Sequence, residues 1–109
     1  MRSIKYDKLV RDKIPEKIIN AGKVPHTIFA DDQTYHLKLK EKLHEEVKEF
    51  SESENLEELA DIIEVVHALV KQKGESIDKL YNIKDAKREK RGGFDQKIIL
   101  KQVDENGKK

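Results

Sequence analysis

The stretch EELADIIEVVHALV, residues 57–70, decides the fold of this chain. Wound as an α-helix, it is apolar over most of its circumference, so we expect it to be packed on several sides. Its apolar positions, counted from the preceding leucine, include Leu56, Leu59, Ile62, Ile63, Val66, Leu69 and Val70. Yet the residues from Glu54 to Val70 include five acids and no lysine or arginine. A helix suited to a core therefore carries negative charge that something else has to offset.

The preceding segment, from about residue 33 to 51, also has the period of an amphipathic helix. Asp31 or Asp32 can cap its start, because a side-chain carboxylate accepts hydrogen bonds from the free N–H groups of a first turn. The expected apolar stripe consists of Leu39, Leu43, Val47 and Phe50. At about 100° per residue, Glu46 lies beside this stripe at the edge of the core, and Glu45 points into water.

Turn-forming residues divide the rest of the chain. A third helix is expected over residues 55–72, with Gly74 closing it. A short helical region within residues 6–22 ends at its own glycine, and a fourth helix covers residues 76–91. Helices therefore account for most of the chain.

Two segments have the composition of strands. Residues 23–30 and 94–103 are rich in β-branched and aromatic residues, and Pro25 limits the first to a sheet edge or a strand start. A two-stranded ribbon is marginal alone, so we expect it to lie against the helices. The predicted fold is mainly α, a compact bundle of about four helices with a small two-stranded β ribbon, forming one domain over residues 1–109. Its last residues, from about 104 to 109, form a frayed tail.

The composition is that of a small and highly charged domain. Of 109 residues, 41% are charged and 36% are hydrophobic, so the core is small and self-association is expected. The absence of cysteine excludes disulfides, thiolate metal ligands and cysteine nucleophiles. No apolar run approaches the roughly 18 residues that cross a membrane, and the N-terminus has no apolar signal region. We therefore expect a cytoplasmic protein without membrane contact.

Charge is segregated along the chain, although the formal net charge is only +1. Residues 1–40 hold nine bases against five acids, residues 41–64 hold ten acids against two bases, and residues 65–109 hold twelve bases against seven acids. A non-specific nucleic-acid binder would favour one broad basic surface, so we expect no stable nucleic-acid binding. An acidic centre between basic segments suits a metal site beside an anion site instead.

Four of the acids form two pairs at helical spacing. Glu46 and Glu49 are three apart in the second helix, and Glu58 and Asp61 repeat that spacing in the third. Residues three apart share a helix face, so facing helices would bring the pairs together, and a cation would offset their repulsion. Mg²⁺ prefers carboxylate oxygens and shares its shell with substrate phosphates. We therefore expect these four residues to be ligands of Mg²⁺, with Mn²⁺ as the alternative.

The competing interpretation of these acids is a solvated, capped helix. Glu54, Glu57 and Glu58 fall in the first turns of the third helix, where acids favour the helix dipole. Asn55 and Glu58 also fit a capping box. Asp61 favours the metal site, because it lies past the first turn of a packed helix and is too short to reach water easily.

The two acidic motifs resemble the signature of the MazG-like, all-α nucleoside triphosphate pyrophosphohydrolase superfamily, E-E-x-x-E followed by E-x-x-D. Here the motifs are EEVKE, residues 45–49, and ELAD, residues 58–61. YDKLVRDKIPEKI near the front and KREKRGGFDQKIIL near the back resemble a small single-domain branch related to phosphoribosyl-ATP pyrophosphohydrolase. The resemblance covers nearly the whole chain. The gap between the motifs is shorter than in many members, so the turn between the two helices is expected to be tight.

The resemblance implies a Mg²⁺-dependent enzyme that cleaves between the α and β phosphates of a nucleotide, giving a nucleoside monophosphate and pyrophosphate. It implies that Glu46, Glu49, Glu58 and Asp61 are the metal ligands and the catalytic residues. It also implies a homodimer or homotetramer, and a role in house-cleaning of non-standard nucleotides or in a phosphoribosyl-ATP-like biosynthetic step. A non-enzymatic helical interaction module is the alternative from a different class.

A triphosphate also needs basic groups opposite the acids. The run KDAKREKR, residues 84–91, supplies five bases in eight positions. Those at helical spacing, which could clamp phosphates, are Lys84, Lys87, Arg88 and Arg91. Lys8, Arg11 and Lys13 form a second candidate group. The competing interpretations are an exposed basic helix end for the first run and a local salt bridge through Asp12 for the second.

Overall fold

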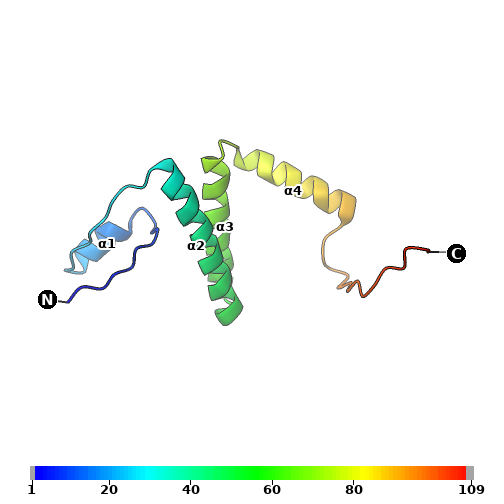
Figure 1. Ribbon diagram of the computed structural model, residues 1–109, viewed down its shortest axis with the longest axis horizontal. Helices are drawn as coiled ribbons and strands as arrows, with labels where there is room; N and C mark the ends of the chain where they lie inside the picture. The colour runs from blue at the N-terminus through cyan, green and yellow to red at the C-terminus, as the bar shows by residue number, and fades with distance from the viewer. Residues whose placement is uncertain (1, 108–109) are drawn as a thin grey trace. The chain divides into compact units, whose positions relative to one another are not determined.

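Four helices make up the regular structure of this computed structural model, which describes residues 2–107 (Figure 1). They are α1 (Ile14–Asn20), α2 (Asp32–Ser53), α3 (Leu56–Gln72) and α4 (Ile77–Arg91). The mainly α fold and the four predicted helices are therefore confirmed, although the first is shorter than the expected region. Within the described range, no helix combines the length and the apolar character that crossing a bilayer requires.

The chain divides into two units, Met1–Ile77 and Asp78–Lys109. The first unit holds α1, α2 and α3, and with them both acidic pairs. The second holds nearly all of α4 and the segment that follows it. The prediction of one domain over the whole chain stays a prediction.

Helices α2 and α3 pack along each other as an antiparallel pair, joined by a tight turn (Figure 1). Only Glu54 and Asn55 separate them, and Glu54 takes the left-handed conformation with φ 58°. At the other end of the pair, His36 Nδ1 on α2 lies 2.8 Å from Gln72 Oε1 on α3. Of the two predicted caps of α2, Asp31 is the N-cap residue, and its carboxylate accepts the Thr34 N–H at 2.8 Å.

Glycine ends both α1 and α3, as the sequence predicts. Gly22 and Gly74 take positive φ values of 80° and 79°, a conformation that a residue without a Cβ adopts readily. In each case the residue after the glycine donates its N–H to the carbonyl five residues earlier, at 3.1 Å. This Schellman closure satisfies carbonyls that the helix end would leave unpaired.

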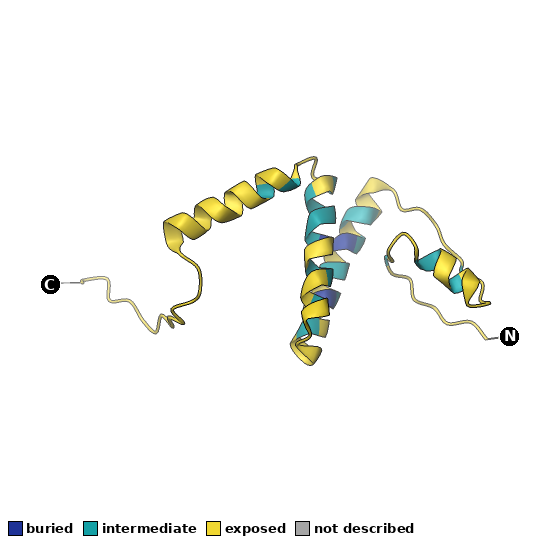
Figure 2. Cartoon of the chain, turned by 180° about the vertical axis from the view of Figure 1, so that it is seen from behind, coloured by how far each residue is buried: buried dark blue, intermediate teal, exposed yellow. Residues whose placement is uncertain are grey.

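The core lies between α2 and α3, and one of its members is charged (Figure 2). Leu39 is 2% exposed, Val65 8% and Glu46 5%, whereas Val47 is 47% exposed. At about 100° per residue, position 46 lies about 20° from Leu39 around α2, while position 47 lies about 80° away. The expectation that Val47 joins the buried stripe is therefore wrong, and Glu46 holds the place inside the core.

Part of α3 is left uncovered within the described chain. Leu56 and Leu59 are exposed, and Ile63 is 51% exposed. The half-buried apolar residues of this helix are Ile62, Val66, Ala68, Leu69 and Val70. Packing of α3 on several sides is thus not achieved by residues 2–107 of a single chain.

The predicted β ribbon is not formed, since no strand occurs in the described residues 2–107. Residues 23–30 and 94–103 are irregular and almost entirely exposed, although their composition favours strands. A strand is stable only when a partner takes up its backbone hydrogen bonds, and these segments fall in different units. Of the predicted tail, residues 104–107 are exposed and irregular, and residues 108–109 lie outside the described range.

Candidate metal centre

Three carboxylates from the two paired helices converge. Glu46 on α2 and Glu58 and Asp61 on α3 each place an oxygen within 4.8 Å of the others. The antiparallel pairing turns Glu46 toward α3, and the three-residue spacing puts the other two on one face of that helix. Oxygen ligands at such spacing could hold a metal ion, and carboxylates favour a hard divalent cation.

Glu49, the fourth predicted ligand, lies next to this triad without belonging to its closest group. After burial, its negative charge and a hydrogen bond with it are the next causes that raise the pKa of both Glu46 and Glu58. Glu49 is exposed, so it forms the outer side of the cluster. All four predicted ligands therefore lie in one neighbourhood.

Burial and repulsion between neighbouring carboxylates raise the pKa of two carboxyls of the cluster. Burial is the main cause that raises the pKa of Glu46, followed by Glu49, with Lys42 acting in the opposite direction. Desolvation also raises the pKa of Glu58, again with Glu49 as the next cause. Asp61 adds to both shifts through its charge. A cation in the cluster would reverse these shifts.

One oxygen of Glu46 has no protein partner. Its Oε1 lies 3.6 Å from Lys42 Nζ, while Oε2 is buried without a hydrogen bond from any residue in the described part of the chain. A buried carboxylate oxygen left unpaired costs free energy. The residues present therefore fit a bound cation, which would supply the contact that Oε2 lacks.

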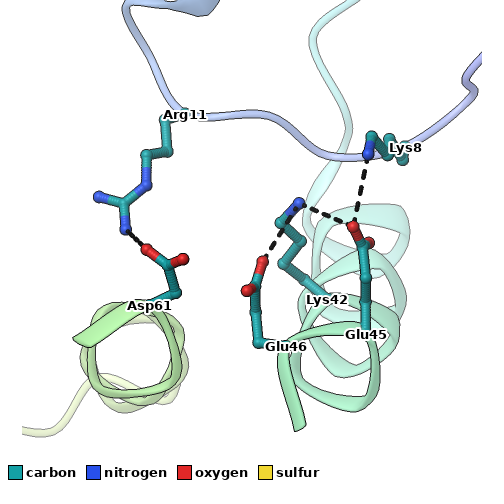
Figure 3. Close-up of polar contacts among 6 residues, drawn as sticks. All are labelled: Lys8, Arg11, Lys42, Glu45, Glu46 and Asp61. Atoms are coloured by element: carbon teal, nitrogen blue, oxygen red, sulfur yellow. Dashed lines mark hydrogen bonds and ion pairs between the residues drawn. The ribbon is translucent and has the colours of Figure 1, made fainter. Parts of the chain in front are cut away.

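The segment before α1 brings basic side chains to the edge of the cluster (Figure 3). Arg11 Nη2 donates to Asp61 Oδ1 at 2.7 Å, and Lys8 Nζ lies 3.4 Å from Glu45 Oε1. Lys42 Nζ lies 3.4 Å from the same Glu45 oxygen. The expectation that Glu45 points into water is therefore wrong, since it is half-buried between two lysines.

These contacts argue against the local salt bridge through Asp12 for Arg11, while phosphate contact by the N-terminal bases stays a prediction. Arg11 pairs across 50 positions of sequence with Asp61, rather than with the neighbouring Asp12. Lys38 Nζ on α2 donates to the Asp7 carbonyl oxygen at 2.9 Å, which ties the same segment down. The segment is thus held against α2 and α3 at the level of the acidic cluster.

A pocket of about 500 Å³ opens beside the cluster, between this segment, α1 and the paired helices. Its apolar lining includes Leu9, Val10, Ile14, Leu39 and Val65. Its charged lining consists of Arg11, Lys13, Lys17, Lys42, Asp12, Glu46, Asp61 and Glu64. The pocket therefore presents carboxylates of the cluster together with several bases, which suits a ligand that carries phosphate.

The other predicted bases belong to the second unit. The bases on α4 for which we predicted phosphate contact are all exposed, and they are Lys84, Lys87, Arg88 and Arg91. Lys84 Nζ donates to Asp85 Oδ1 at 3.0 Å, and Arg88 Nη2 lies 3.7 Å from Asp95 Oδ2. Their contact with phosphate stays a prediction.

The alternative capping box at the start of α3 is not formed. Asn55 is the N-cap, but its side chain makes no capping hydrogen bond. The Glu58 N–H donates to the Asn55 backbone carbonyl at 3.1 Å. The Glu58 carboxylate is instead part of the acidic cluster.

Sequence reasoning missed three charged residues of the pocket. Lys42 lies four residues before Glu46, and Lys17 lies four residues after Lys13, so helical spacing alone could have signalled both. Glu64 follows Asp61 at the same three-residue spacing as the acidic pairs.

Comparisons of the chain with protein-family models, with curated proteins and with solved structures find no match.

Proposed function

We propose that this chain is a nucleoside triphosphate pyrophosphohydrolase that depends on Mg²⁺, with Mn²⁺ as a substitute. It cleaves between the α and β phosphates and releases a nucleoside monophosphate and pyrophosphate. The observation that carries the proposal is the convergence of Glu46, Glu58 and Asp61 beside a pocket that also holds bases. Carboxylates bind hard cations, and the same cations bind phosphate oxygens.

The chain's own residues divide the work in this proposal. Glu46, Glu58 and Asp61 would hold the metal, and Glu49 would hold water or a further ligand at the exposed side. A divalent cation bound there would offset the charge of the carboxylates and phosphates and favour attack by water. Glu46 fixes the position of the site, because its carboxylate is held inside the core.

The uncovered face of α3 supports a homodimer or homotetramer. Leu56, Leu59 and Ile63 are apolar and exposed on the helix that carries two of the metal ligands. A second copy of the chain that covers this face would bury apolar surface, and each Å² removed from water stabilises the assembly by about 25 cal/mol. A non-enzymatic interaction module would use the same face of α3. Only the enzyme would hydrolyse a nucleotide, so turnover distinguishes the two functions.

A pyrophosphate-release assay over a nucleotide panel tests the proposal. The panel comprises standard, oxidised and deaminated nucleoside triphosphates and phosphoribosyl-ATP, each with and without Mg²⁺. We expect release from at least one of them, only with the metal, and with a monophosphate as the second product. Release from phosphoribosyl-ATP alone would assign the biosynthetic role. No Mg²⁺-dependent release from any member would contradict the proposal and leave the interaction module as the function.

Two variants connect the activity to the cluster. Glu49→Gln and Asp61→Asn should each nearly abolish turnover while the helical content stays unchanged, because each removes a charge from a crowded cluster without changing its shape. Glu41→Gln is the matched control, since Glu41 is an exposed acid of α2 outside the pocket. Unchanged turnover in both cluster variants would remove these residues from the mechanism.

A further inference from the structure

We propose that Arg11, Lys13 and Lys17 form an anion subsite for the pyrophosphate part of the substrate, and that a bound metal ion strengthens anion binding there. The inference rests on the proposed function, because it concerns the same pocket. It assigns the phosphate contacts to the start of the chain and to α1, with no contribution needed from the bases of α4. Of these residues, Lys17 carries no expectation from the sequence.

Lys13 and Lys17 have free donors inside the pocket. Lys13 is the N-cap residue of α1 and Lys17 lies four residues later, in the last turn of this helix, a spacing that places their side chains on the same side. Both line the pocket and both are exposed. Neither ammonium has an ion pair or hydrogen bond with another residue between positions 2 and 107. By contrast, Arg11 and Lys42 already hold carboxylates.

The charge of the pocket depends on the metal. Its lining contains four bases and four acids, so it is formally neutral. Glu49 and Glu58 next to it make the neighbourhood negative, which repels a polyphosphate. A divalent cation adds two positive charges within the cluster, so that binding of the metal favours binding of the anion. By linkage, the anion must strengthen binding of the metal by the same factor.

Arg11 provides a structural route for this coupling. Its guanidinium donates to Asp61 at 2.7 Å and therefore acts as the counter-ion of a predicted metal ligand. A cation bound by the Asp61 carboxylate would free N–H groups of the Arg11 guanidinium. Arg11 lines the same pocket as Lys13. Guanidinium groups bind phosphate through two parallel hydrogen bonds, so the released side chain suits the anion. Arg11 thus binds the Asp61 carboxylate when the pocket holds no metal, and binds the phosphate when metal and anion are both present.

Calorimetric titration of inorganic pyrophosphate into the full chain, with and without saturating Mg²⁺, tests the subsite. We expect binding that weakens at least about tenfold when Mg²⁺ is omitted, in the range of typical coupling between sites. The double variant Lys13→Ala/Lys17→Ala should weaken the Mg²⁺-dependent binding by at least about tenfold, because it removes two charged hydrogen bonds. The control is Lys5→Ala/Lys23→Ala, which removes two exposed lysines of the same unit from outside the pocket and should change nothing.

Titration of Mn²⁺ alone separates the subsite from the metal centre. The Lys13→Ala/Lys17→Ala variant should bind Mn²⁺ as the wild type does, and its turnover should show a raised KM for the nucleotide. Wild-type affinity for pyrophosphate in this variant, or equal affinity with and without Mg²⁺, would overturn the subsite while leaving the proposed function intact. Failure of the wild type to bind Mn²⁺ and to hydrolyse any nucleotide would overturn both.

Discussion

Replacing Glu46 by glutamine should make the metal-free protein more stable and remove its response to Mg²⁺. Glutamine keeps the shape of the buried side chain and deletes its charge. That charge lies within 4.8 Å of oxygens of Glu58 and Asp61, and each such pair repels by about 3.5 kcal/mol at an effective dielectric constant of about 20. Lys42 Nζ, 3.6 Å from Oε1, offsets about 4.6 kcal/mol of this repulsion.

The remaining imbalance sets the size of the effect. The two repulsions exceed the attraction by about 2 kcal/mol; the charge of Glu49 adds to this figure, and solvent screening at the half-exposed Glu58 and Asp61 lowers it. We therefore expect the free energy of unfolding of Glu46→Gln to exceed that of the wild type by about 1–2 kcal/mol without metal. For a domain of this size, the melting temperature should rise by roughly 5–10 °C.

Thermal unfolding followed by circular dichroism, with and without Mg²⁺, measures both parts of this prediction. A ligand that binds only the folded state raises its stability, so the wild type should melt at a higher temperature with Mg²⁺. Glu46→Gln should melt at the same temperature with and without it, and the exposed control Glu41→Gln should respond as the wild type does. A metal-free Glu46→Gln protein less stable than the wild type, or one with the full Mg²⁺ response, would refute the reasoning.

Three further predictions concern protons, the Arg11 contact and self-association. The pKa values of Glu46 and Glu58 are raised in the folded state, so their contribution to metal-free stability should grow as the pH falls through these raised values toward the ordinary 4.5, and be lost as the pH rises. The difference in urea unfolding free energy between the wild type and Glu46→Gln over this pH range measures the contribution of Glu46, and a difference that grows with rising pH would contradict the prediction. Arg11→Ala should strengthen Mn²⁺ binding in calorimetry, because Arg11 no longer competes with the ion for the Asp61 carboxylate. The free energy of unfolding should fall by less than about 1 kcal/mol, since the Arg11–Asp61 ion pair is largely exposed. Weaker Mn²⁺ binding would contradict the proposal that the metal replaces Arg11 as the partner of Asp61. Ile63→Lys should lower the molar mass measured by light scattering without loss of helix, because Ile63 is 51% exposed in a single chain; an unchanged mass would exclude this face from the interface.

Features that depend on nearby residues could be predicted from the sequence. Apolar period and glycine closure located the helices, and Asp31 was identified as one of two possible caps. The pairing of the acids also followed, because a tight turn between two helices forces them to run antiparallel. Glu46, Glu58 and Asp61 then meet through spacing alone.

Features that depend on distant residues, or on which positions of a helix face the core, could not be predicted from the sequence. The strand-like composition of residues 23–30 and 94–103 says nothing about whether a partner strand is available. The exchange of Val47 for Glu46 in the core turns on about 100° of rotation around α2. The contact of Arg11 with Asp61 joins segments 50 positions apart, and no local pattern in the chain indicates it.

Titration of Mn²⁺ into the metal-free chain, followed by the electron paramagnetic resonance signal of the free ion, tests the central claim most directly. The wild type should bind the ion, and Glu46→Gln and Asp61→Asn should each bind it at least about tenfold more weakly, because loss of a ligand should cost no less than loss of a ligand's supporting contact. A wild type that leaves all Mn²⁺ free, or variants with wild-type affinity, would contradict the claim that these carboxylates form a metal centre.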